Sequence, residues 1–94
     1  MVIARYHWKA KTGCREELIK LVKAAVEELG FTPRVCTYVW GFWDTVTSDL
    51  EFETMEDEGK FWDNVDTSQP AFAELVEKEP DLFESHWREL LQVH

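Results

Sequence analysis

The chain has 94 residues, a formal net charge of −9 at pH 7 and a hydrophobic content of 45%, with five Trp and six Phe. This length predicts one domain covering residues 1–94, and a domain this small buries only roughly 60–65% of the surface that its unfolded chain exposes. We therefore expect a partner subunit to add stability. The negative charge argues against nucleic acid as a partner, because binding phosphates requires a basic patch and the sequence has none.

The sequence gives no sign of a membrane protein. No apolar run approaches the roughly 18 residues that span a bilayer, and no leader segment follows Met1. The negative charge also disfavours anionic membrane surfaces. We expect no membrane partner and a cytoplasmic location. In that reducing compartment Cys14 and Cys36 are expected to be free thiols, although the sequence also allows a disulfide.

The segment from Val2 to Ala10 alternates between two kinds of side chain, which is typical of a half-buried strand. The even-numbered positions, Tyr6 and Trp8 among them, are apolar. The odd-numbered positions include Arg5 and His7 and are mostly cationic. The pattern therefore predicts a strand with one apolar and one polar face.

A tight turn at Lys11-Thr12-Gly13 leads into an amphipathic helix from about Arg15 to Leu29. Its apolar residues recur every three or four positions along one side: Leu18, Leu21, Val22, Ala25 and Leu29. Gly30 supplies the stop signal that often follows a helix.

The middle of the chain predicts a β-hairpin. Thr32-Pro33 opens an extended segment from Arg34 to Trp40, whose side chains suit a pleated sheet. Residues Gly41 to Asp44 are expected to connect it to a strand from Thr45 to Thr54, which again alternates between an apolar and a polar face.

After the hairpin the spacing becomes helical. Glu56-Asp57-Glu58 places negative charge in a first helical turn, where the helix dipole favours it. Phe61, Trp62 and Val65 give this helix its apolar side. The segment 66–70 then breaks the helix.

Pro70 can occupy the first turn of a further helix, and Pro80 is expected to end it. Three apolar residues share one side of this helix: Phe72, Leu75 and Val76. The tail, 84–94, fits either a helix or a strand, and we favour the strand. The element order is then β-α-β-β-α-β, which predicts an α+β fold of the ferredoxin-like type, a four-stranded antiparallel sheet with its helices on one face.

Two stretches resemble the dimeric α/β-barrel superfamily and, within it, the antibiotic biosynthesis monooxygenase-like domains. Ala4 to Gly13 resembles the first strand and Lys-Pro-Gly turn of that group, and Glu53 to Glu58 resembles its Glu-x-Trp-x-Asp strand end. The resemblance covers nearly the whole chain and implies sheet-to-sheet dimers. The group includes cofactor-independent oxygenases, haem-degrading enzymes, isomerases and proteins without known activity.

Three positions depart from the pattern of that group. Met55 stands where the group often has Trp, and Asn64 stands near a common helical His. Tyr6 occupies the place of the Asn that haem degraders use. Because these departures remove groups that the family chemistry uses, catalytic roles are not carried over residue by residue. We expect no haem and no other cofactor.

The polar face of the predicted sheet is the first candidate site, because in this fold the first strand lies between the third and the fourth. A functional site here would use His7 and His86 as acid and base or as metal ligands. No ligand spacing such as His-x-His is present, so we favour structural ion pairs and expect no bound metal. Arg5, His7 and Lys9 would face two groups of partners: Asp49, Glu51 and Glu53 on one side, and His86 and Arg88 on the other.

The apolar side of the sheet holds the second candidate site. Ligand pockets are mostly apolar with a few placed polar groups, whereas ordinary core packing is the simpler interpretation of an aromatic face. Five residues could line a flat cleft between sheet and helices: Tyr6, Trp8, Phe52, Trp62 and Trp87.

The end of the predicted hairpin carries more aromatic residues than the rim of one small core requires: Tyr38, Trp40, Phe42 and Trp43. A dimer contact is the main interpretation and a ligand lid the minor one, since large exposed apolar patches are uncommon on monomers. The acidic runs are interpreted as solvated helix faces and ends: Glu16-Glu17, Glu56-Asp57-Glu58 and Glu77 to Asp81.

These observations favour a homodimeric ferredoxin-like protein that binds a small apolar or aromatic molecule, with cofactor-independent monooxygenase-like chemistry as its catalytic form. The alternative is a non-catalytic dimeric structural or interaction module whose cavities are filled by side chains. An enzyme should present an open cleft with a buried titratable group near it, whereas a module should show neither.

Overall fold

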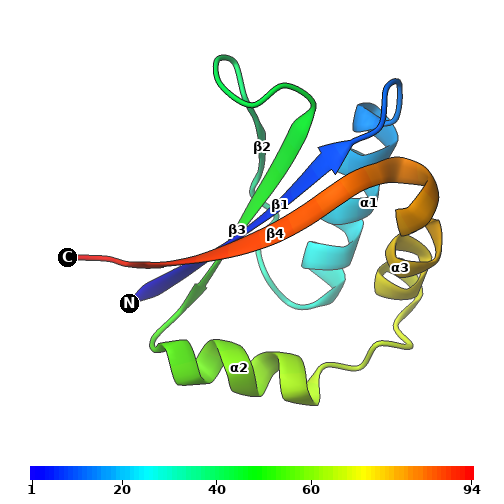
Figure 1. Ribbon diagram of the computed structural model, residues 1–94. Helices are drawn as coiled ribbons and strands as arrows, with labels where there is room; N and C mark the ends of the chain where they lie inside the picture. The colour runs from blue at the N-terminus through cyan, green and yellow to red at the C-terminus, as the bar shows by residue number, and fades with distance from the viewer.

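Four antiparallel strands form a twisted sheet in the computed structural model, which describes residues 1–94 (Figure 1). The strands are β1 (Val2–Ala10), β2 (Val35–Thr37), β3 (Thr45–Phe52) and β4 (Phe83–Gln92), and their order across the sheet is β2-β3-β1-β4. The central strand β1 therefore pairs with both β3 and β4. The predicted ferredoxin-like α+β fold is confirmed, and so is the strand in the tail.

The helices α1 (Arg15–Glu28), α2 (Met55–Asn64) and α3 (Pro70–Leu82) lie on one side of the sheet (Figure 1). α1 packs beside α3 and contacts β3, whereas α2 runs below the ends of the strands. α2 begins after Thr54, whose hydroxyl accepts a hydrogen bond from the backbone N–H of Asp57 at 3.2 Å. The opposite face of the sheet, called the open face below, carries no helix.

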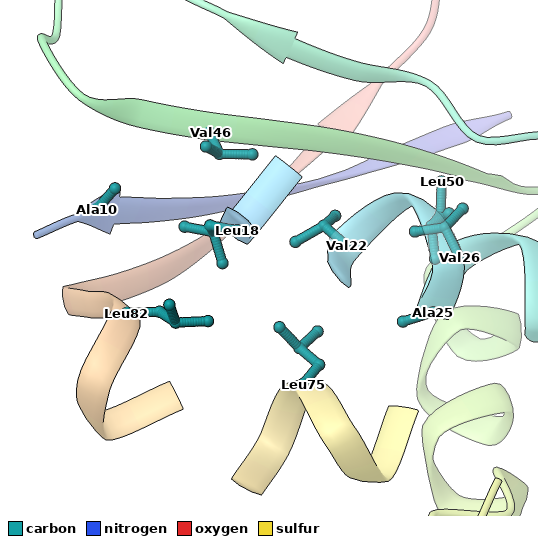
Figure 2. Packing of buried hydrophobic residues seen from close by; sticks show 9 residues of the cluster. All are labelled: Ala10, Leu18, Val22, Ala25, Val26, Val46, Leu50, Leu75 and Leu82. Atoms are coloured by element: carbon teal, nitrogen blue, oxygen red, sulfur yellow. The ribbon is translucent and has the colours of Figure 1, made fainter. Parts of the chain in front are cut away.

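The hydrophobic core lies between the sheet and the pair α1 and α3 (Figure 2). Leu18 and Val22 of α1 are at most 1% exposed, and Leu75 of α3 points toward them. The predicted apolar stripe of α1 is therefore the side that packs on the sheet. Nine buried residues form this core: Ala10, Leu18, Val22, Ala25, Val26, Val46, Leu50, Leu75 and Leu82.

β2 is much shorter than the predicted strand from Arg34 to Trp40. Its pairing with β3 ends where Thr37 faces Val46, so residues 38–44 form a loop, called the aromatic loop below. Gly41 has a φ of +124° in this loop, and a Cβ atom there would lie 3.0 Å from the ring of Tyr38. Glycine permits both the backbone turn and the close approach of the Tyr38 ring within this loop.

α3 continues through Pro80 to Leu82, although Pro80 was expected to end it. The turn after β1 contacts this end of the helix. Lys11 Nζ donates a hydrogen bond to the Pro80 carbonyl at 2.6 Å, and the Lys11 backbone N–H donates to the Leu82 carbonyl at 2.8 Å. These donors satisfy carbonyl groups at the end of the helix and thereby stabilise the turn that contains the proline.

β4 pairs with β1 so that His7 faces Trp87 and Trp8 faces His86. Because side chains alternate between the faces of a strand, Trp87 lies on the open face and His86 and Arg88 lie on the helix side. The sequence interpretation assigned all three to the opposite faces and was wrong. A shift of one residue exchanges the faces of a strand, and β4 follows α3 without a turn that could reveal its register.

Two neighbouring residues of α3 test this packing. We expect Leu75→Ala to lower the free energy of unfolding by about 2–5 kcal/mol, because Leu75 is 5% exposed and its truncation leaves a cavity in the core. Val76→Ala should cost about 0.5 kcal/mol or less, because Val76 is 48% exposed, although the sequence pattern placed it on the apolar side. Urea denaturation followed by circular dichroism measures both losses, and equal losses would contradict the orientation of α3.

Candidate functional site

A cavity of about 430 Å³ lies on the helix side of the sheet, between β1, β4, α2 and α3. Its walls are mostly aromatic and aliphatic, and a few ionisable groups stand among them. The lining residues are Tyr6, His7, Trp8, Trp62, Phe72, Leu75, Glu79, His86, Trp87 and Arg88. Another hollow, of about 310 Å³ beside Phe31 and Arg34, has only one aromatic wall.

Four of the five predicted pocket residues, Tyr6, Trp8, Trp62 and Trp87, border the larger cavity. Trp87 does so although its ring stacks on that of His7, with ring centroids 4.7 Å apart. The fifth, Phe52, is placed elsewhere. Its ring contacts those of Phe31 and Phe61, each with centroids 5.7 Å away.

A hydrogen-bond network centred on Glu58 connects three residues of the cavity lining, Tyr6, Trp62 and Arg88. Glu58 comes from the first turn of α2 and is only 3% exposed. Its carboxylate accepts a hydrogen bond from the Tyr6 hydroxyl at 3.0 Å, and Arg88 Nη1 donates to its two oxygens at 2.9 and 3.2 Å. The Tyr6 hydroxyl in turn accepts a hydrogen bond from Trp62 Nε1 at 2.8 Å. The network therefore joins β1, α2 and β4.

Tyr6 is held in its neutral form by this environment. Burial raises the pKa of Tyr6 well above its ordinary value, and the negative charge of Glu58 adds to the rise, while the hydrogen bond from Trp62 opposes it. The hydroxyl has both a donor and an acceptor partner. Tyr6 is therefore a structural support of the Trp62 ring and not a proton acceptor for a ligand.

Sequence reasoning missed Glu58, which it assigned to a solvated helix end. The buried position follows from helix geometry, because Glu58 precedes Trp62 by four residues and so lies on the same side of α2. That spacing was the available signal. A charged residue on an apolar helix side requires a partner, and Arg88 is supplied by a strand whose register the sequence did not reveal.

Glu79 and His86 are the other polar groups of the cavity. Glu79 lies in the last turns of α3 and His86 on β4. Burial raises the pKa of Glu79, and the nearby His86 opposes this rise. His86 therefore belongs to this cavity, whereas the sequence placed it with His7 on the polar face.

The open face carries a separate set of polar contacts around His7. The side chain is 2% exposed, with Nδ1 2.9 Å from Thr47 Oγ1 and Nε2 2.5 Å from a carboxylate oxygen of Glu89. The predicted pairing across β1 and β3 is confirmed for Arg5, whose guanidinium donates two hydrogen bonds to Asp49 at 2.9 and 3.0 Å. The hydrogen bond to Asp49 raises the pKa of Arg5.

Histidine, cysteine and carboxylate side chains form no group of three or more that could hold a metal ion. Both ring nitrogens of His7 already have hydrogen-bond partners: Nδ1 contacts Thr47, and Nε2 contacts Glu89. The contacts on the open face thus have the form of structural polar pairs.

No helix of the chain has both the length and the apolar composition needed to cross a bilayer.

Several solved structures share this fold. A NIPSNAP domain protein from Burkholderia xenovorans is 11% identical, with a TM-score of 0.79 over 100% of this chain and 95% of that one. A NIPSNAP family protein from Agrobacterium tumefaciens is 16% identical, with a TM-score of 0.76 over 97% and 90% of the two chains. An antibiotic biosynthesis monooxygenase is 11% identical, with a TM-score of 0.63 over 100% and 99%.

These similarities confirm the fold that the sequence resemblance implied, and at such identities they extend to the fold alone. No protein-family model and no curated protein matches the sequence. The function must therefore be argued from the residues of this chain.

The raised pKa of Tyr6 predicts a pH-dependent contribution to stability. The folded protein keeps a proton that the unfolded chain releases above its ordinary pKa of about 10, so the contribution of the hydroxyl is complete below pH 10 and declines as the pH rises. We expect Tyr6→Phe to lower the free energy of unfolding by about 1–3 kcal/mol at pH 8. This difference from the wild type should shrink by pH 11.

Denaturant titrations of both proteins at the two pH values measure the effect. The two proteins share every other titrating group, so the change in their difference isolates Tyr6. A difference that stays constant or grows with pH contradicts the assigned environment of Tyr6.

Proposed function

We propose that the protein is a homodimer in which each copy binds a small aromatic molecule in the cavity between β1, β4, α2 and α3. The observation that carries this proposal is the cavity itself, whose 430 Å³ falls in the range of small-molecule sites. Aromatic walls of Trp8, Trp62 and Phe72 provide apolar area, and Glu79, His86 and Arg88 provide the few polar groups that orient a ligand.

The Glu58 network supports binding by fixing the cavity wall in advance. Trp62 is held by its hydrogen bond to Tyr6 and by edge contact with the Tyr6 ring, at a centroid distance of 5.7 Å. A side chain that is already ordered loses little conformational freedom when a ligand arrives. Trp62 is therefore the wall that we expect to contribute most to affinity.

This expectation can be tested with 1,4-naphthoquinone as a flat aromatic probe. Trp62→Ala should raise the dissociation constant about tenfold or more, because it removes apolar contact area, and Trp62→Phe should have a smaller effect. Isothermal titration calorimetry measures the constants. Val76→Ala is the control, since Val76 lies on α3 outside the cavity lining and is 48% exposed.

An unchanged dissociation constant in Trp62→Ala, with the fold intact by circular dichroism, would place the site elsewhere. Absence of saturable binding by the wild type would favour the alternative of a non-catalytic module whose cavities are filled by side chains. The adjoining hollow, which Ser48 and Leu50 help to line, is an example of a cavity filled by side chains, because only about 60 Å³ of it is open.

The catalytic form of this proposal is a monooxygenase-like reaction without a cofactor, as the resemblance suggests. A reaction that begins by removing a proton from the ligand requires a group that can accept it. Tyr6 is excluded from this role because both of its hydrogen bonds are occupied and its pKa is raised. The available proton acceptors of the cavity are Glu79 and His86.

The dimer in this proposal forms through the open face and the aromatic loop. Trp87 and Leu91 leave apolar surface on the open face, at 38% and 36% exposure. The loop continues this surface, because the ring of Phe42 lies edge-on to that of Trp87, with ring centroids 6.4 Å apart. The same ring also contacts that of Tyr38, with centroids 5.6 Å apart. A continuous exposed apolar surface of this kind favours a contact with another protein chain.

The tip of the loop is still more exposed, with Trp40 at 88% and Trp43 at 72%. Aromatic side chains are enriched at the centres of interfaces, where they lose contact with water. A second copy of this chain, packed against the open face, would cover both regions and help a domain too small to bury much surface alone. We expect such an interface to bury about 1,200–2,000 Å².

We expect the wild type to sediment as a dimer at micromolar concentration. Leu91→Arg on the open face and Trp43→Ala in the loop should each weaken the dimer, because they remove apolar contact, and the arginine also adds a charge that must be desolvated. Val76→Arg is the control, because it adds the same charge on the helix layer, where Val76 is 48% exposed. Sedimentation equilibrium decides the question, and a monomeric wild type would refute the dimer.

A further inference from the structure

Glu79 is the one carboxylate of the cavity lining, and it has no hydrogen-bond or ion-pair partner. Of the other ionisable lining groups, His86 lies near Glu79 and opposes the rise of its pKa without forming a hydrogen bond or ion pair with it, and both ring nitrogens of His7 have partners. Arg88 is neutralised by Glu58 at 2.9 Å, and Tyr6 remains a neutral phenol. With histidine counted as neutral, the cavity therefore has a net negative charge, located at Glu79.

This carboxylate is partly removed from water by the cavity wall. Burial raises the pKa of Glu79, which means that its charge is incompletely solvated. No hydrogen-bond donor of the protein replaces the lost water. A ligand that brings a positive charge or an N–H donor to Glu79 would therefore be favoured over a ligand that brings an anion.

We infer that the cavity selects aromatic amines, with the protonated nitrogen paired to Glu79 and the ring against Trp8 and Trp62. This inference rests on the proposed binding of an aromatic molecule and names the chemistry of that ligand. Tryptophan ring faces attract cations, so the same walls that hold the ring also stabilise the charge beside it. Glu79 is thus a specificity-determining residue of the site.

The remaining charges agree with this selection. An aromatic carboxylate would meet an arginine whose charge is already balanced, because Nη1 of Arg88 donates to both Glu58 oxygens. Its own charge would also be repelled by Glu79. At long range, the net charge of −9 attracts cations to the surface and repels anions.

Three probes with the same ring separate these effects: 1-naphthylmethylamine, 1-naphthylmethanol and 1-naphthylacetate. Isothermal titration calorimetry at pH 7.5 should show the amine binding at least about tenfold more tightly than the alcohol, with the acetate weakest. If the acetate binds as tightly as the amine, this inference is overturned while the proposed binding of aromatic molecules stands. If none of the three binds saturably, the proposed function fails and this inference with it.

Two glutamate variants on the same helix complete the test. Glu79→Gln should reduce the preference for the amine over the alcohol to about twofold or less, and leave the affinity for the alcohol nearly unchanged. Glu77→Gln removes the same charge from an exposed position of α3 outside the cavity and should keep the preference. An equal loss of preference in both variants would show a general effect of net charge and would overturn the role of Glu79.

Discussion

The buried carboxylate of Glu58 is the constraint on which the rest of the site depends. A charge that is 3% exposed is strongly destabilising unless it is paired and hydrogen-bonded. Arg88 supplies the counter-charge and Tyr6 a further hydrogen bond, so the ion is tolerated only when α2, β1 and β4 are in their observed positions. Because α2 lies below the ends of the strands and outside the main core, this network is its principal polar attachment, and it also sets the orientation of Trp62 (Figure 1).

The elements that sequence reasoning predicted correctly are those whose own periodicity determines what they bury. The side chains of β1 alternate in the sequence between an apolar and a polar set, and α1 carries a stripe that must face the sheet. The errors occur where a feature outside this periodicity decides where an element ends. α3 passes through Pro80 into a last turn whose carbonyls accept hydrogen bonds from Lys11, and the pairing of β2 ends at Thr37, ahead of the turn at Gly41. The contact from Lys11 joins residues 69 positions apart, so it is not visible in the local pattern.

The candidate site also contains residues that the sequence could assign and residues that it could not. Tyr6, Trp8 and Trp62 could be assigned to one cavity because β1 and α2 each have a clear apolar side. His86 and Trp87 could not be assigned, since the faces of β4 depend on a register that its own sequence leaves open and that shifts between Lys9 and Ala10. Once β4 is paired, the polar groups of the cavity and the aromatic surface of the open face are determined together.

β4 therefore links the two proposed surfaces of the protein. Its even-numbered residues His86 and Arg88 point to the cavity, and its odd-numbered residues Trp87 and Glu89 point to the open face around His7. As an edge strand, β4 is paired on one side only, through β1. A second copy packed on the open face would hold Trp87 in place and thereby restrain the backbone that carries His86 and Arg88. Dimerisation would then order part of the cavity wall without contributing a residue to it.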